Sequence, residues 1–455
     1  MPLECAHCGT RCDDGATRCP RCLRTTHLVA IQDAAPKRGG PKRALVIGAF
    51  ALVALAGGTF AWIRARAPSD APRVPEQVAP SAADPLAIET PELRAVVERL
   101  RAITDATARA RSAAEEVHRR RAAALTAHGD PVPPPRSPDL VWRLLPSQRE
   151  AVTELDLARL VAALLRAAGD ARASVAERTA PARPDEPLDA LGSFVAVTGE
   201  SAVEVTQGTL VGASSVRHAR LGDVALAGAI SAQAALEAAA SGASHERAVQ
   251  YANAAVEAWG DSPVPLVARA RVWTLAGASG GLPLAESDLR AALSMRDDAA
   301  IELSIARVLL LRGDVLGASR AVLHAASLAP AWGHAAVALL CLRDVNAQLD
   351  AGAPDGCERL RQARAPWTDD AYALCARETP EATRSASARR LFEASHDPLR
   401  RAWAATFLGP DAGASLRRAL PPVDRREAAA WLSLLARPDL AAAVMGVAPD
   451  GGAAP

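Results

Sequence analysis

Five of the eight cysteines in this 455-residue chain lie within its first 22 residues. Four of them form two Cys-x-x-Cys pairs, Cys5 with Cys8 and Cys19 with Cys22, and ten residues separate the pairs. Thiolates are preferred ligands of zinc, and two tight turns that each present two thiolates suit its tetrahedral coordination. The spacing therefore predicts a structural Zn²⁺ held by these four residues. Because so short a segment has almost no core, the metal would supply most of its folding free energy.

The double-pair motif resembles the short zinc ribbon found at the N-termini of many bacterial proteins, over residues 1–26. Two neighbours are competing ligands: Cys12 could replace Cys8 or Cys19, and His7 lies inside the first pair. Disulfides or a redox pair are the alternative to a metal site. The segment has no aromatic side chain that could stack on a base, which favours a protein contact or a structural cap over nucleic-acid binding.

Residues 44–63 form an apolar run of twenty residues without a charge, about the length that crosses a bilayer as a helix. Trp62 lies near its end, where aromatic rings prefer the membrane interface. Basic residues gather in the preceding linker, so the positive-inside rule places the N-terminus in the cytoplasm, although Arg64 and Arg66 weaken the asymmetry. A cleaved signal peptide is the alternative, but this run is longer than a usual signal core. We expect a single-pass protein of the cell inner membrane whose C-terminal domain is periplasmic.

Composition favours helices and argues against several kinds of catalysis. Half of the residues are hydrophobic, much of that content is alanine, and aromatic residues make up only 3%; alanine is the best helix former, and strands favour other types. The only lysines are Lys37 and Lys42, so Schiff-base, P-loop and kinase chemistry have no lysine after the apolar run. Beyond residue 67 the chain carries 42 basic and 47 acidic residues, which argues against nucleic-acid binding.

A helix-pair pattern recurs in the second half of the chain. Its clearest copy has large and small residues that let two helices nest, closed by a proline: Ile305, Ala306, Leu309, Ala318, Val322, Ala325 and Pro330. The pattern resembles the tetratricopeptide repeat (TPR) in degenerate form. The last small position recurs at residues 255, 292 and 325, and Gly356, Leu360 and Ala363 would be a fourth copy. The resemblance implies a groove for a peptide or a partner protein; an irregular helical domain is the alternative.

The segment before the repeats is expected to be helical at first and loop-rich later. Thr90 is a plausible N-cap for a helix that ends near Gly129, with a stripe of apolar residues that is either a packing face or a coiled-coil seam. Ser147 opens a capping-box pattern for a second helix that ends near Gly169. Alternating apolar residues at 194–197 and 202–205 indicate a short hairpin.

Three cysteines remain after the apolar run. Cys341 and Cys357 fall on neighbouring predicted helices and could form a disulfide in an oxidising compartment, with Cys375 left over. All three could equally be reduced and buried as small apolar side chains.

The predicted fold is mostly α: a TPR-like α-solenoid with a small N-terminal zinc ribbon and one transmembrane helix. The expected parts are a zinc ribbon (1–26), a basic linker (27–43), a membrane helix (44–63), a Pro/Ala-rich linker (64–89), a helical region (90–180), a loop-rich region (181–222), repeats (223–380), further helices (381–440) and a disordered tail (441–455).

These features favour a non-enzymatic scaffold or adaptor. Its outer domain would bind one protein and its cytoplasmic ribbon another. The alternatives are an accessory to an envelope enzyme, which needs a polar cleft, and a transmembrane regulator that contacts the transcription machinery, which needs a basic N-terminal surface. The sequence names neither the partner nor the oligomeric state.

Overall fold

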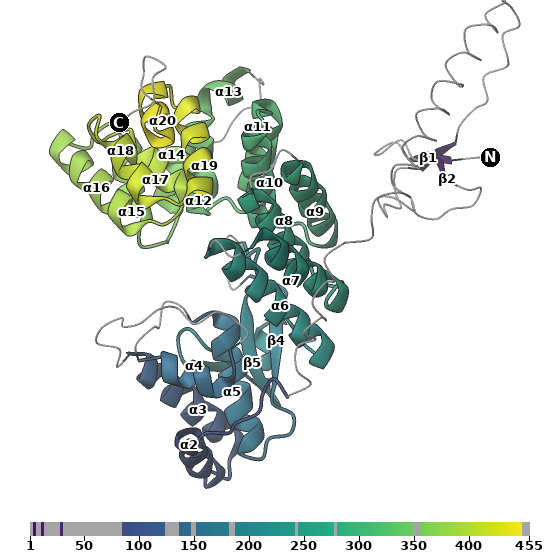
Figure 1. Ribbon diagram of the computed structural model, residues 1–455. Helices are drawn as coiled ribbons and strands as arrows, with labels where there is room; N and C mark the ends of the chain where they lie inside the picture. The colour runs from purple at the N-terminus through teal and green to yellow at the C-terminus, as the bar shows by residue number, and fades with distance from the viewer. Residues whose placement is uncertain are drawn as a thin grey trace, which may run out of the picture. The chain divides into compact units, whose positions relative to one another are not determined.

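The computed structural model divides the chain into two units, residues 1–82 and 83–455 (Figure 1). In the first unit it describes only the backbone of three short strands. In the second it describes residues 84–122, 136–146, 152–181, 187–241, 244–276, 280–348 and 355–447. The predicted membrane helix, linkers and tail fall wholly or largely outside these residues. So do three of the four predicted zinc ligands, Cys8, Cys19 and Cys22.

The first unit contains a three-stranded antiparallel sheet with the order β2-β1-β3. Its strands are β1 (Leu3–Cys5), β2 (Arg11–Cys12) and β3 (Leu28–Ala30), and Leu3 pairs with Cys12 while Cys5 pairs with Leu28. The backbone of the fourth predicted ligand, Cys5, therefore ends β1. Among the helices that the structure describes, none is long and apolar enough to cross a membrane.

The second unit is mostly helical, as predicted, and its first part is built around one helix. This helix, α5 (Glu154–Ala167), is buried from Leu155 to Leu165 without interruption. It contacts α2 (Pro91–Arg101), α3 (Ala106–Ala122), α4 (Pro138–Leu144) and the sheet described below. Because α5 is buried on every side, including at its charged residues Asp156 and Arg159, other elements must surround it.

The predicted helix beginning at Thr90 starts where expected but is broken. Thr90 is the N-cap of α2, and most of the stripe from Leu93 to Val117 is buried in one core with α5, as a packing face requires. At the break in the stripe Ile103 is half-buried and Thr107 is exposed. The chain leaves the helix after Ala102 and resumes at Ala106, where the Asp105 carboxylate accepts a hydrogen bond from the Ala108 amide. The prediction of one continuous helix was therefore wrong, because a residue that caps a new helix lies in its middle.

The next helix has the predicted end but a different cap. Ser147 lies outside the described residues, and the capping box of α5 is made by Thr153 and Asp156. After α5 the chain turns at Gly169, whose φ of +103° lies in the left-handed region that favours glycine.

A five-stranded antiparallel sheet follows, with the order β7-β6-β5-β4-β8. The predicted hairpin is β5 (Phe194–Thr198) with β6 (Ser201–Glu204), and Ala196 pairs with Val203. The sequence prediction missed the other three strands: β4 (Ser174–Arg178), β7 (Thr209–Gly212) and β8 (His218–Arg220). These strands are short, and β7 and β8 at the edges are largely exposed, so they lack the clear apolar alternation of a half-buried strand.

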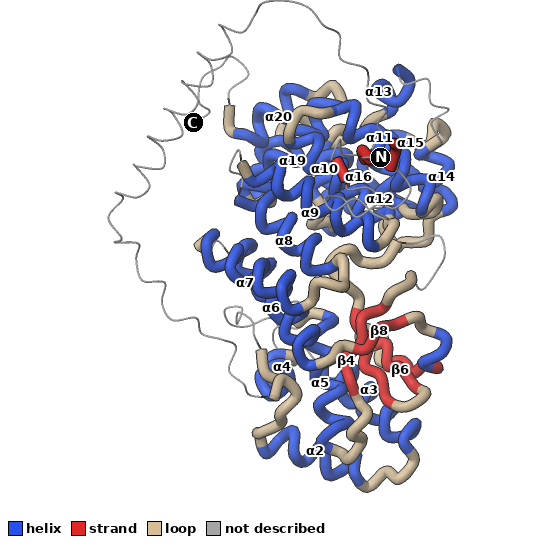
Figure 2. The backbone as a smooth tube through the Cα atoms, turned by 90° about the vertical axis from the view of Figure 1, so that its right-hand side faces the viewer, coloured by secondary structure: helices blue, strands red, loops and turns tan. Residues whose placement is uncertain are grey.

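Helix pairs then succeed one another along the chain (Figures 1 and 2). The small residues of the first three predicted copies are buried, and their last small positions Ala255, Ala292 and Ala325 are fully covered. In the fourth copy Ala363 is half-buried and follows the end of α14. From α6 to α13 each helix contacts the next one along the chain, and α14 contacts α12. The helices are α6 (Asp223–Ala240), α7 (His245–Ala258), α8 (Val264–Ala276), α9 (Gly281–Met295), α10 (Ala299–Leu311), α11 (Val315–Leu328), α12 (Gly333–Cys341), α13 (Arg343–Gln348) and α14 (Gly356–Gln362).

The C-terminal segment is helical, as expected, and it folds back onto the earlier helices. Its helices are α15 (Thr368–Cys375), α16 (Glu381–Ala394), α17 (Pro398–Ala405), α18 (Ala412–Ala419), α19 (Pro422–Leu434) and α20 (Pro438–Met445). Helix α19 contacts α8 and α10, and α17 contacts α12 (Figure 2). The C-terminal helices thus pack against the first helices of successive pairs at α8, α10 and α12.

Candidate functional site

A pocket of about 230 Å³ lies where two helix-connecting turns meet. One turn leads from α11 into α12 and contributes Trp332 and His334; the other joins α14 to α15 and contributes Arg364 and Trp367. The described residues that line it are Pro187, Ala331, Trp332, Gly333, His334, Arg364, Ala365 and Trp367. Among these residues the pocket combines aromatic rings and an arginine, without a carboxylate.

The two turns are held by specific hydrogen bonds. The buried Thr368 hydroxyl donates to the carbonyl oxygens of Ala363 and Ala365, at 3.2 and 2.6 Å, and closes the second turn. The Arg359 guanidinium donates to the carbonyl oxygens of Ala326 and Pro330, at 2.6 and 3.1 Å, and ties α14 to the first turn. The pocket wall is thus a fixed structure, as a preformed binding site requires.

Gly333 allows the two turns to approach each other. A Cβ atom at this position would lie 2.7 Å from Thr368 Cγ2 and 2.8 Å from a ring carbon of Trp367. Both distances are shorter than real Cβ contacts, so any side chain at residue 333 would push the Trp367 indole out of the pocket wall.

His334 lies between the two tryptophans and is neutral at pH 7. Its ring centroid is 5.2 Å from that of Trp332 and 5.0 Å from that of Trp367. Burial, together with the positive charges of Arg400 and Arg307, lowers the pKa of His334 to about 4, against the opposing effect of Asp397. The imidazole therefore adds an uncharged aromatic surface to the pocket.

Behind the pocket lies a charged cluster that joins three helices. Arg307 of α10 pairs with Asp397, the N-cap of α17, at 2.5 Å and with Glu427 of α19 at 3.2 Å. Burial alone would raise the pKa of Asp397, but Arg307 and His334 hold it well below its usual range. Burial raises the pKa of Glu427. Since Arg307 joins α17 and α19 to α10, the cluster fixes these C-terminal helices against α10.

Arginines dominate the charge near the pocket. The Arg400 guanidinium lies 4.6 Å from the centre of the Trp367 ring, in cation–π range. The Arg364 side chain is exposed at the rim and forms no ion pair with any residue that the structure describes. The pocket is therefore bordered by positive charge that a bound ligand can use.

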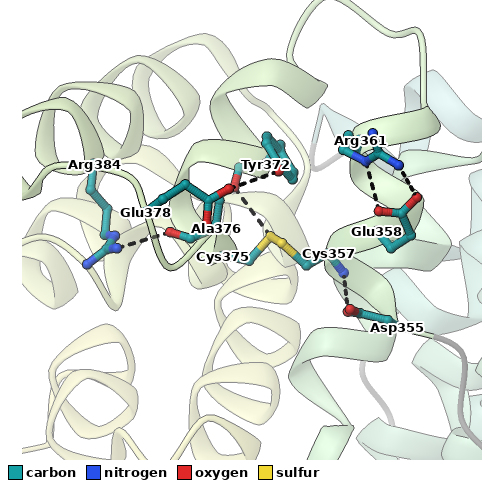
Figure 3. The surroundings of a disulfide bond; sticks show 9 residues. All are labelled: Asp355, Cys357, Glu358, Arg361, Tyr372, Cys375, Ala376, Glu378 and Arg384. Carbon is teal, nitrogen blue, oxygen red and sulfur yellow. Dashed lines mark hydrogen bonds and ion pairs between the residues drawn. A yellow bond between two sulfur atoms is a disulfide. The ribbon is translucent and has the colours of Figure 1, made fainter.

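A disulfide closes the other end of the hairpin that carries Arg364 and Trp367 (Figure 3). It joins Cys357, in the first turn of α14, to Cys375, the last residue of α15, with a Cα–Cα distance of 5.8 Å. Neither alternative that the sequence left open holds in full: Cys357 is bonded to Cys375 and not to Cys341, and only Cys341 is free and buried in the core. Burial raises the pKa of the Cys341 thiol far above neutral, so this thiol is not a nucleophile at neutral pH.

The sequence predicts a metal site, which the described residues do not test, and gives no prediction of the pocket. The predicted ligands fall in the first unit, where the structure describes no side chain, and among the described residues no group of three or more His, Cys, Asp or Glu side chains could hold a metal. The signal for the pocket was the position of two tryptophans. Trp332 follows Pro330 closely and Trp367 follows Pro366 directly, so both lie in turns and not in apolar helix stripes.

No family model matches the chain, and neither do any curated protein or solved structure.

Proposed function

We propose that this protein is a non-enzymatic, single-pass membrane scaffold whose outer helical domain binds a segment of a partner protein at the pocket between Trp332 and Trp367. The observation that carries the proposal is the pocket itself. Tryptophan and arginine are the residues that most often dominate protein–protein binding energy, and here they gather on a fixed wall with no acid, base or nucleophile arranged around a reacting atom.

The TPR-like succession of helix pairs supports a binding role. Arrays of this kind present surfaces to other proteins. Because α19 and α17 pack against the first helices of the pairs, binding would take place at the turn-side pocket and not along a groove. In this proposal the zinc ribbon of Cys5, Cys8, Cys19 and Cys22 is a structural element that engages a second partner on the cytoplasmic side.

The Cys357–Cys375 disulfide supports an extracytoplasmic place for the helical domain, because disulfides persist in oxidising compartments. The expected outcome of thiol labelling in cells is that Cys357 and Cys375 are blocked until a reductant is added. Finding both thiols reduced in intact cells would place the domain in the cytoplasm and contradict the proposed topology.

Site-specific photocrosslinking in intact cells tests the binding site. We expect a photoreactive residue at Ala365, on the pocket wall, to capture one partner reproducibly, and Arg364→Glu in the same chain to abolish the capture. Arg343→Glu is the matched control, since Arg343 is exposed and lies outside the pocket. If capture is unchanged by Arg364→Glu, or equally reduced by Arg343→Glu, the pocket is not the binding site.

A further inference from the structure

The size of the pocket limits what can enter it. Sites for cofactors and drug-sized ligands usually enclose about 300–1,000 Å³, and this pocket has about 230 Å³. It is therefore too small for a nucleotide or a large cofactor, and it holds one or two amino-acid side chains. The ligand is better accommodated as a chain that crosses the pocket than as a molecule enclosed by it.

The walls select for a flat apolar ring. Trp332, His334 and Trp367 contribute three aromatic rings whose neighbouring centroids lie 5.0–5.2 Å apart, and His334 is uncharged at neutral pH because burial lowers its pKa. Aromatic-lined grooves recognise proline in the extended polyproline II conformation, which loses little entropy on binding because it is already formed.

The charge at the rim selects for an anion. Aromatic rings alone would also suit a cation, but Arg364 borders the pocket, and none of the described residues that line it is Asp or Glu. A lysine-rich segment would meet like charge at Arg364. A carboxylate beside the proline could instead form a charge-assisted hydrogen bond with Arg364.

We infer that the pocket recognises an extended, acidic, proline-containing segment of a partner protein, with a proline ring against the aromatic wall of Trp332, His334 and Trp367 and a flanking carboxylate on Arg364. This inference rests on the proposed binding function and specifies its ligand.

Fluorescence polarisation with the purified full-length protein in detergent tests this inference. The probes are labelled nine-residue peptides with a Glu-Pro-Pro-Glu centre, the same peptide with alanine for both prolines, and the same peptide with lysine for both glutamates. We expect the acidic proline peptide to bind at least about tenfold more tightly than either control, a difference that one charged hydrogen bond can supply.

Charge reversal makes the test independent of folding. Arg364→Glu is expected to weaken the acidic peptide at least about tenfold and to bind the lysine peptide better than the wild type does, a gain that an unfolded variant could not show. Arg343→Glu should leave all three affinities unchanged. The proline inference would be overturned if the wild type bound the alanine peptide as tightly as the proline peptide and Arg364→Glu bound neither. The proposed function would then remain intact. No binding of any peptide, together with no capture at Ala365, would overturn both.

Discussion

The region around α5 (residues 84–222) and the helix-pair region (223–447) bury their cores in opposite ways. The first surrounds one buried helix, α5, with large side chains from distant parts of the chain, such as Leu93 and Phe194. The second brings helix backbones together over small residues, such as Ala292 and Ala325. Where large side chains fill the core, a substitution that removes side-chain volume should lower the free energy of unfolding most. Where helix backbones lie close together, a substitution that adds side-chain volume should lower it most.

Leu164→Ala should have the largest effect among the changes considered. Leu164 is fully buried in α5 and surrounded by helices and sheet, so the surroundings can collapse little into the cavity. We expect a loss of about 4 kcal/mol in the free energy of unfolding, measured by urea denaturation of the full-length protein. A loss below about 1 kcal/mol would show that the α5 core is loosely packed and remove the contrast between the regions.

Arg307→Met should cost about 3 kcal/mol, because it leaves Asp397 and Glu427 partly buried without their cation. The same denaturation measurement checks it, with hydrogen exchange to locate the change at α17 and α19. The control is Arg290→Met: Arg290 pairs with Glu286 one turn away on an exposed surface, and such pairs contribute only about 0.3–0.5 kcal/mol. Equal effects of the two changes would mean that the Arg307 cluster does not fix the C-terminal helices.

Ala292→Leu tests the helix-pair region in the opposite direction. Ala292 is fully covered where α9 meets its neighbours, and extra methylene groups in a well-packed core cost about 1–3 kcal/mol. We expect about 2 kcal/mol by urea denaturation. If the larger side chain is neutral or stabilising, the helices are not in close contact there and the repeat-like packing is refuted.

His334 and three buried carboxyl groups around α5 should make contributions of opposite sign to the pH dependence of stability. The pKa of His334 falls to about 4 in the folded protein, so the unfolded chain binds more protons between about pH 4 and 6.5, and stability rises with pH over this window. In the region around α5, burial raises the pKa of Glu154, Glu177 and Asp189. Their contributions are greatest below their unfolded pKa, near 4, and are lost as pH rises through the folded value.

Two variants separate these opposing slopes. As pH falls from 6.5 to 4, the wild type should lose stability and His334→Gln should not, so the variant should become progressively more stable relative to the wild type. As pH rises above about 4, the wild type should lose the stability contributed by protonated Glu154, so Glu154→Gln should become progressively more stable relative to the wild type. If the plots of unfolding free energy against pH are parallel for the wild type and His334→Gln, His334 titrates normally and is accessible to solvent.

The sequence predicted the parts of the fold that depend on neighbours along the chain. The mostly α class, the buried small positions of the helix pairs and the β5–β6 hairpin follow from local periodicity, and the structure has them. The edge strands β7 and β8 and the return of α19 onto α8 and α10 depend on contacts between distant residues, which periodicity does not encode. The pocket depends on such contacts too: Trp332 and Trp367 come together only because α12 and α15 meet.

The position of α19 also limits how this protein can vary in length. Open arrays of helix pairs gain or lose a pair with little penalty, since each pair touches only its neighbours. Here Asp424 pairs with Arg271 of α8 while Glu427, three residues further along α19, pairs with Arg307 of α10. The two ion pairs made by α19 therefore require a fixed distance between α8 and α10. Inserting or deleting a pair between α8 and α10 would break this match, so we expect insertions and duplications to be confined to the loops.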